Sequence, residues 1–316
     1  MSAPKYSVII PAYNEEKNIF PLYKKLKSVM KKMKDDYEMI FINDGSTDGT
    51  KKKLEKLSDK DGKIRVLNLS RNFGQTPALA AGFDNARGDI IITMDADLQN
   101  DPEDIPRLIE KMDQGYDVVS GWRADRKDSF GKRFFSGMSN RIAGRLTGLR
   151  LHDYGCTLKA YRKEAIDSVE LYSEFHRYIP ALMYQKGYDV TELKVKHHER
   201  KRGETKYGSK RLFRGILDLI NLSFWNAFST RPMHFFGGIG IFSFSIGLLI
   251  SVYLTFLKYF YGISLSNRPL LLLSILLMVL GIQLFMFGFL GAMVVRVYYG
   301  DNRRKIYHLK KAEEKK

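Results

Sequence analysis

Two aspartates separated by one residue, Asp95 and Asp97, offer the clearest chemistry in this sequence. They follow Ile90 to Met94, an apolar and mostly β-branched run that predicts a buried strand of a parallel sheet. The spacing puts both carboxylates on one face of an extended chain, at the carboxyl edge where open α/β sheets bind ligands. Two convergent carboxylates suit a divalent cation whose remaining ligands come from a diphosphate. The alternative is a pair of solvated turn residues.

Three further polar loops are predicted at strand ends: Pro11 to Glu15, Asn43 to Asp48 and Ser70 to Gly74. In a parallel sheet these loops converge on the edge that carries the two aspartates, so they predict a nucleotide-sized polar cleft rather than separate turns. In such a cleft Asp44 can accept hydrogen bonds from a base N–H. The first strand is followed by no GxGxxG, and the chain has no GxxxxGK[ST], so neither a dinucleotide cofactor nor a P-loop nucleotide is expected.

The elements that would position these loops alternate between strand and helix over about the first 125 residues. This alternation predicts an α/β fold with a doubly wound, mostly parallel sheet. Strands are expected at 6–11, 37–43, 64–69, 90–95 and 117–121. Helices are expected at 16–34, from a cap at Asp48 to about 60, at 77–87 and at 102–114. Further on we expect a helix at 132–147, a strand at 158–161, a helix at 174–186 and a strand at 189–197.

Charge and cysteine content narrow the class of protein. Lys plus Arg number 52 and Asp plus Glu number 35, a net charge of +17 that points to nucleic acid, an anionic membrane surface or a phosphorylated substrate. The single cysteine, Cys156, excludes an intramolecular disulfide and a CxxC metal site. A reducing, cytoplasm-facing location fits, and the first residues show no apolar signal segment.

Two long uncharged segments predict membrane spans at about 235–257 and 270–295. Each exceeds the roughly 20 residues that cross a bilayer core, and the short link between them predicts a helical hairpin. Basic residues flank both spans, so the positive-inside rule places the N-terminal domain and both termini in the cytoplasm. Attraction of these flanks to anionic lipid accounts for the net charge, and nucleic acid is not expected as a partner.

The chain therefore divides into four predicted parts: a cytoplasmic α/β domain at 1–208, an amphipathic helix at 209–231, two spans within 232–297 and a basic cytoplasmic tail at 298–316. Apolar residues at helical spacing, with basic residues on the opposite side, predict that the amphipathic helix lies in the membrane interface. The alternative is a helix that packs on the soluble domain.

Several motifs, in order, give the chain a family resemblance: PAYNEE, NDGSTDGT, RNFGQ, DADLQ, GWR, HDYGCTLKAYR and RKRGETKY. It resembles family 2 glycosyltransferases of the GT-A fold over its whole length. The most similar subgroup is the polyprenyl-phosphate sugar transferases, such as dolichyl-phosphate mannose synthases and undecaprenyl-phosphate glucosyl- and formamido-arabinose transferases. This resemblance implies an inverting transfer of a sugar from a nucleotide sugar to a lipid phosphate.

The resemblance also implies roles for residues on the donor side. By this resemblance the nucleoside would be bound by Pro11, Tyr13, Glu15 and Asp44. The Mg2+ or Mn2+ that bridges the donor diphosphate would be held by Asp95, Asp97 and Gln99, and it would neutralise charge on the leaving group. Arg202 and Lys206 would cover the same diphosphate, with membrane-surface binding as the alternative.

On the acceptor side the resemblance implies a cationic grip on the lipid phosphate, made by Arg123, Lys132, Arg133 and Ser136. A phosphate monoester is mostly charged near neutral pH, so it needs orientation and screening more than a general base. Asp153 lies where other family members place a base. We interpret it as a group that orients the acceptor or a sugar hydroxyl and can also act as base, against a structural turn residue.

Departures from the family pattern also carry information. The chain lacks the Gln-x-x-Arg-Trp motif of processive members, so a single-sugar transfer is expected. The rival hypotheses are another lipid acceptor, such as diacylglycerol or a ceramide, and a non-catalytic membrane scaffold.

The two-span architecture favours UDP over GDP as the nucleotide of the donor, whereas the sequence leaves the identity of the sugar open. Glycines at 237, 238 and 240 allow close helix packing and hence a possible homo-oligomer.

Overall fold

The structure is a computed structural model that describes residues 3–124, 137, 140–141, 143–145, 147–169, 171, 175–198, 232–265 and 268–300, with side chains to 294. The chain forms two compact units, an α/β unit and a helical unit. The predicted amphipathic helix, most of the basic tail, and Lys132, Arg133, Ser136, Arg202 and Lys206 lie outside the described residues.

The α/β unit is built on one seven-stranded sheet with the order β3-β2-β1-β4-β6-β5-β7. The strands are β1 (Tyr6–Ala12), β2 (Tyr37–Asn43), β3 (Ile64–Asn68), β4 (Ile90–Thr93), β5 (Val118–Trp122), β6 (Lys159–Arg162) and β7 (Val190–Lys194). All pairings are parallel except those of β6, which runs antiparallel between β4 and β5. The predicted doubly wound, mostly parallel sheet is confirmed.

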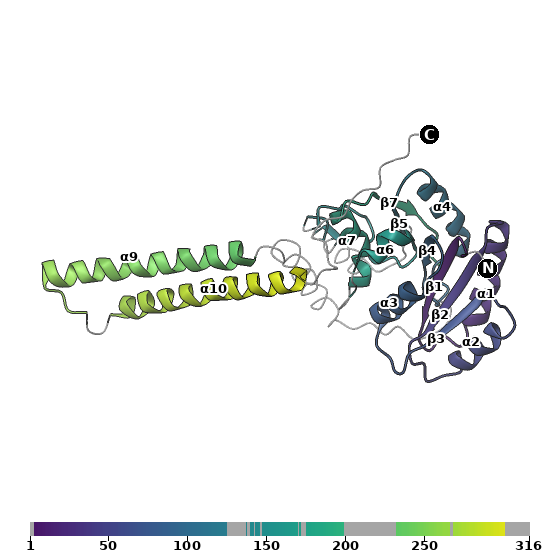
Figure 1. Cartoon of the computed structure of the whole chain (residues 1–316), viewed down its shortest axis with the longest axis horizontal. Coiled ribbons are helices and arrows are strands. Elements are labelled where there is room, and N and C mark those ends of the chain that lie inside the picture. Colours follow the sequence, from purple (N-terminus) through teal and green to yellow (C-terminus); the bar gives the residue numbers. More distant parts are fainter. Residues whose placement is uncertain are drawn as a thin grey trace. The chain divides into compact units, whose positions relative to one another are not determined.

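Helices cover both faces of this sheet (Figure 1). They are α1 (Ile19–Lys32), α2 (Thr50–Ser58), α3 (Gln75–Asn85), α4 (Ile105–Asp113) after the 3-10 turn η1 (Pro102–Asp104), α6 (Lys163–Asp167) and α7 (Ile179–Gln185). In β1, Val8 and Ile10 pack in a cluster with α1, α2 and α4, whereas Ile9 packs on the other face with α3, α6 and α7. This alternation follows from the two-residue repeat of a strand, and burial on both faces explains the nearly continuous apolar runs.

Three sequence predictions differ from the structure in detail. The helix expected at 174–186 is a 3-10 turn, η2 (Phe175–Arg177), followed by α7, because Pro180 fits the first turn of a helix, where its missing N–H costs nothing. The strand expected to reach 197 ends at Lys194, after which only an isolated bridge joins His197 to Asn100. Gly49, not Asp48, precedes α2, although the Asp48 carboxylate still accepts the Thr50 amide.

The antiparallel direction of β6 has a direct consequence for the site. Lys159, the first residue of β6, lies beside Thr93, the last residue of β4. The chain just before β6 therefore reaches the same carboxyl edge as the loops after β1, β2, β4 and β5. This topology brings residues 152–158 to that edge.

The helical unit consists of α9 (Gly238–Tyr261), preceded by the π-helical turn η3 (Met233–Gly237), and α10 (Pro269–Gly300). Met233–Tyr261 and Pro269–Val294 are long and apolar enough to cross a membrane. The two helices pack antiparallel, with Ser243 Oγ donating to the Leu277 carbonyl at 2.9 Å. A Cβ added at Gly240 would lie 2.6 Å from the Gly281 carbonyl oxygen, so this glycine serves a contact within the chain.

Candidate functional site

The first two polar loops of the sheet edge are joined by hydrogen bonds. Asn14, in the left-handed region at φ 55°, receives the Thr47 amide on its side-chain oxygen at 2.8 Å and donates its own amide to Ser46 Oγ at 3.0 Å. The Glu15 amide donates to Thr50 Oγ1 at 2.9 Å. These bonds fix the loop after β1 on the loop after β2, and Pro11, Tyr13 and Glu15 belong to this region.

The third loop docks onto the second through Asp44. This carboxylate is only 4% exposed, and it accepts the amides of Phe73 at 2.8 Å and Gly74 at 3.0 Å. Burial raises the pKa of Asp44, while the two amide hydrogen bonds act in the opposite direction. Gly45 has φ 65°, and a Cβ there would lie 2.3 Å from the Arg71 carbonyl carbon. Only glycine allows this close approach of two backbones.

Asp95, just beyond β4, is held on both of its oxygens. Gln75 Nε2, in the first turn of α3, donates to Oδ1 at 2.8 Å, and Thr157 Oγ1, just before β6, donates to Oδ2 at 2.7 Å. Burial, and secondly the negative charge of Asp97, raise the pKa of Asp95 to about 6. Both hydrogen-bond donors are neutral, and the positive charge of Arg123 acts on the pKa of Asp95 in the opposite direction to burial and Asp97.

Asp97 and Gln99 flank a strained turn. Leu98 adopts φ 65°, which is costly for a residue with a branched side chain, and its side chain packs against the core. Asp97 Oδ1 accepts the Gln99 amide at 3.0 Å. The described residues contain no cluster of three His, Cys, Asp or Glu that could hold a metal ion. Asp95 and Asp97 supply two carboxylates, which are the oxygen donors that divalent cations prefer.

Arg123 and Asp153 form a bidentate ion pair on the other side of the edge. Arg123 follows β5 and donates through Nε to Asp153 Oδ2 at 2.7 Å and through Nη2 to Oδ1 at 3.0 Å. Burial by itself would lower the pKa of Arg123, but the hydrogen bonds and charge of Asp153 outweigh it and raise this pKa. The Gly155 amide also donates to Asp153 Oδ1, at 3.0 Å.

A second contact between the same two segments was not predicted. Trp122 and His152, the residues just before the paired ones, stack with ring centroids 4.1 Å apart. Glu192 of β7 accepts the His152 amide at 2.9 Å and also contacts its ring Nδ1, while Lys194 Nζ lies 4.9 Å from the Trp122 ring centroid. Within each motif the two residues are neighbours, Trp122 with Arg123 and His152 with Asp153, but the sequence does not reveal that the two motifs meet.

The loop with the two aspartates is also tied to the chain after β7. The His198 amide donates to the Gln99 carbonyl at 2.8 Å, and its ring Nε2 lies 2.8 Å from Asp101 Oδ2. Among the described residues, the site therefore gathers Asp44, Asp95, Asp97, Gln99, Arg123 and Asp153 at one edge, as the topology requires.

The fold is that of a GT-A glycosyltransferase. The structure of glucosyl-3-phosphoglycerate synthase from Mycobacterium tuberculosis with phosphoglyceric acid matches with a TM-score of 0.53 and 19% identity, over 71% of this chain and 80% of that chain. A structure of the same enzyme with Mn2+, uridine diphosphate and its product matches with a TM-score of 0.52 and 19% identity, over 70% of this chain and 80% of that chain.

Residues 7–169 match the family model described as glycosyl transferase family 2, and the chain belongs to that family. A dodecaprenyl-phosphate galacturonate synthase from Rhizobium johnstonii is 40% identical over 95% of this chain and 90% of its own length. An undecaprenyl-phosphate 4-deoxy-4-formamido-L-arabinose transferase from Pseudomonas aeruginosa is 37% identical over 92% and 85%. The predicted resemblance to polyprenyl-phosphate sugar transferases is confirmed.

Proposed function

We propose that this protein transfers one sugar from a nucleotide sugar to a polyprenyl monophosphate, with inversion at the anomeric carbon. The observation that carries the proposal is that one edge of the sheet holds two features: the acidic Asp95–Asp97 loop and the buried Arg123–Asp153 ion pair. An acidic subsite suits a metal-bound diphosphate, and a neighbouring cation suits an anionic acceptor. The names of the relatives, which act on dodecaprenyl and undecaprenyl phosphate, support this acceptor class.

On the donor side, Asp95, Asp97 and Gln99 would hold Mg2+ or Mn2+, which when bound screens the negative charge of the departing nucleoside diphosphate. Asp44 keeps lone pairs beyond its two amide bonds for a base N–H, and Pro11, Tyr13 and Glu15 complete the nucleoside subsite. Arg202 and Lys206 stay predictions for the diphosphate. UDP is the expected nucleotide, because the two-span architecture favours UDP over GDP.

On the acceptor side, the nucleophile is a phosphate oxygen that is already charged near neutral pH, so the reaction needs no strong base. Both oxygens of Asp153 accept hydrogen bonds from Arg123, which favours a role in positioning over a role as base. Arg123 would orient and screen the phosphate through its remaining N–H groups. Lys132, Arg133 and Ser136 stay predictions for the same phosphate.

The two apolar helices, which are long enough to cross a membrane, fit this function because a polyprenyl chain is apolar and partitions into the bilayer. We infer that the hairpin anchors the protein in the membrane, with the α/β unit and both termini on the cytoplasmic side, where nucleotide sugars are made. A homo-oligomer stays a prediction, and Gly240 packs against α10 within the chain.

The test is to incubate the purified full-length protein in detergent with undecaprenyl phosphate, Mn2+ or Mg2+ and a panel of UDP- and GDP-sugars, and to detect glycolipid by mass spectrometry. We expect one polyprenyl-phosphate sugar, lost in Asp97→Asn and retained in the control Asp113→Asn, which changes an exposed aspartate at the end of α4. Transfer to diacylglycerol instead would replace the acceptor assignment. Absence of nucleotide-sugar binding would overturn the assignment of the protein as a glycosyltransferase.

A further inference from the structure

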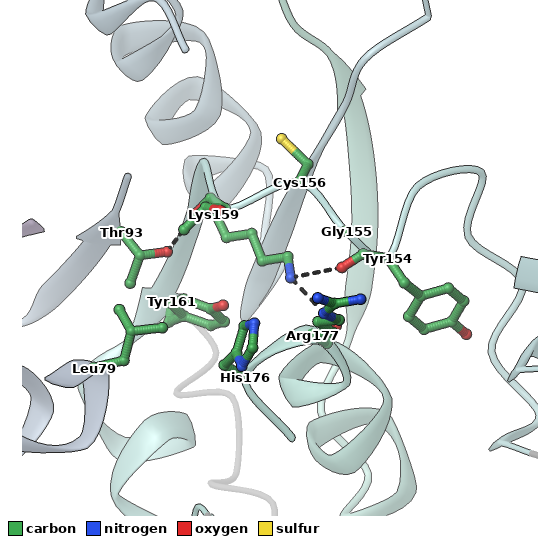
Figure 2. A pocket seen from close by; sticks show the side chains of 10 residues that line it. Leu79, Thr93, Tyr154, Gly155, Cys156, Lys159, Tyr161, His176 and Arg177 are labelled. Atoms are coloured by element: carbon green, nitrogen blue, oxygen red, sulfur yellow. Dashed lines mark hydrogen bonds between the residues drawn. The ribbon is translucent and has the colours of Figure 1, made fainter. Parts of the chain in front are cut away.

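A small pocket is lined by both apolar and polar side chains, among them Leu79 of α3 and Tyr161 of β6 (Figure 2). Both of these residues belong to the core cluster on the side of the sheet covered by α3 and α7. Its volume is about 10 Å³, room for about one water molecule or one oxygen atom of a ligand. Thr93 of β4, Thr157 and Lys159 around the start of β6, and Arg177 of η2 are among its lining residues. The pocket therefore accepts the end of a substituent, not a whole sugar.

Lys159 is the unusual residue of this pocket. It is 2% exposed, yet its Nζ meets only two carbonyl oxygens among the described residues, of Tyr154 at 3.2 Å and of Arg177 at 3.4 Å (Figure 2). An ammonium group has three N–H donors, so one remains for a ligand or a water molecule. Burial lowers the pKa of Lys159 to about 8, which records the cost of a buried cation without a carboxylate partner.

The lining contributes cationic side chains. Arg177 lies with Lys159 in it, beside His176, and among the described residues no Asp or Glu lines the pocket. His176 Nδ1 is 2.7 Å from Thr76 Oγ1, so the first turn of α3 fixes the ring in place. The pocket therefore presents hydrogen-bond donors and positive charge to whatever enters it, and an oxyanion is the complementary group.

The position of the pocket links it to the reaction. Thr157, in its lining, donates to Asp95, where the donor diphosphate is proposed to bind. Gly155, also in its lining, donates to Asp153 of the acceptor-side ion pair. A sugar is attached directly to the diphosphate, so a group on its ring lies within reach of a pocket that borders both subsites.

We propose that the transferred sugar is a uronic acid, and that Lys159, with Arg177, receives its carboxylate in this pocket. The inference rests on the proposed function, since it assigns the substrate class of that same site. An acceptor phosphate is the other oxyanion available, but room for one oxygen suits the end of a planar carboxylate better than a tetrahedral phosphate with three free oxygens.

The first experiment measures binding of UDP-glucuronate and UDP-galacturonate against UDP-glucose and UDP-galactose to the full-length protein in detergent with Mn2+, by calorimetry. These pairs differ only in a carboxylate against a hydroxymethyl group. We expect at least one uronate to bind about 10- to 100-fold more tightly than its neutral partner, as a charge-assisted hydrogen bond in a buried pocket provides. The same ratio is expected in kcat/KM. Equal or tighter binding of both neutral donors overturns the inference, whether or not transfer occurs.

Variants separate this role from a structural one. Lys159→Met is expected to abolish the preference for the uronate and to leave binding of the neutral donor within about twofold, whereas the control Lys163→Met, near the far end of β6, keeps the preference. Arg177→Gln, which leaves Lys159 in place, is expected to weaken the preference partly and covers the case that Lys159→Met fails to fold. An equal loss for all donors, or a raised KM for the lipid phosphate with an unchanged ratio, overturns the inference. Failure of transfer with an intact binding preference would instead count against the proposed function alone.

Discussion

The two halves of the sheet edge are held together in different ways. The loops after β1, β2 and β3 are joined mainly by hydrogen bonds from backbone amides, with Asn14, Asp44 and Gly45 at the junctions. The loops around β4, β5 and the start of β6 are held by charged and strained groups, with Asp95, Leu98 and the Arg123–Asp153 pair at their centre. The first half is held by hydrogen bonds from neutral donors, whereas the second holds a buried carboxylate, Asp95, whose charged form is disfavoured by burial and by Asp97.

Matched substitutions of one aspartate in each half test this difference most strongly. Asp95→Asn should lower kcat by about 100- to 1,000-fold, because it removes a metal ligand that acts on developing charge. Asp44→Asn should instead raise KM for the donor about tenfold with kcat little changed, because it disturbs only nucleoside binding. Steady-state kinetics with donor and acceptor varied separately would measure both. The comparison would be wrong if Asp95→Asn changed mainly KM for the donor and Asp44→Asn changed mainly kcat.

Breaking the buried ion pair should cost stability on the charged side. Either Arg123→Gln or Asp153→Asn alone should lower the free energy of unfolding by about 3 kcal/mol, because each leaves a buried charge without its partner. The double variant should lose less than the sum of the two single losses. Urea unfolding of the four proteins checks this double-mutant cycle, and additive losses would mean that the pair is not coupled.

Gly45→Ala, in the first half of the edge, should lower stability by about 2 kcal/mol, because alanine is strained at φ 65° and its Cβ meets the backbone of the third loop. Gly62→Ala is the control, since a Cβ at that position meets nothing within 4 Å. Thermal unfolding with and without UDP should show that Gly45→Ala also weakens nucleotide protection. An unchanged melting temperature would show that the second and third loops can separate freely.

The smallest effect is expected at the His152 stack. His152→Ala should cost about 1 kcal/mol of stability through loss of the Trp122 ring contact and the exposed Glu192 contact. His152→Phe should recover most of it, because it keeps the stacked ring and loses only the interaction with Glu192. Chemical unfolding of the two variants decides between ring stacking and charge. A loss of unfolding free energy in His152→Phe as large as that in His152→Ala would favour charge.

The sequence allowed prediction of what depends on local pattern. Apolar runs, and for β7 an alternating pattern, located the strands of the sheet, and the acids and asparagines that follow β1, β2 and β4 located the edge. The partner of Arg123 could not be found this way, because Asp153 reaches it only through the antiparallel entry of β6. The break at Tyr178 was missed although Pro180, which is disfavoured inside a helix and favoured in its first turn, was the available signal. The glycine at 240 indicated close packing but could not show that α10 of the same chain is the partner.

The insertion of β6 between β4 and β5 also sets an order of events during protein synthesis. Ile91 of β4 pairs with Tyr161 of β6, 70 residues later (161 − 91). At ribosomal rates this separation corresponds to roughly 4 to 14 seconds, during which β4 has an open edge and Asp95 lacks Thr157. The apolar run Ile90 to Ile92 at that edge is a site for mispairing in the nascent chain. A chaperone that shields this strand until Arg162 has emerged would therefore raise the yield of folded enzyme.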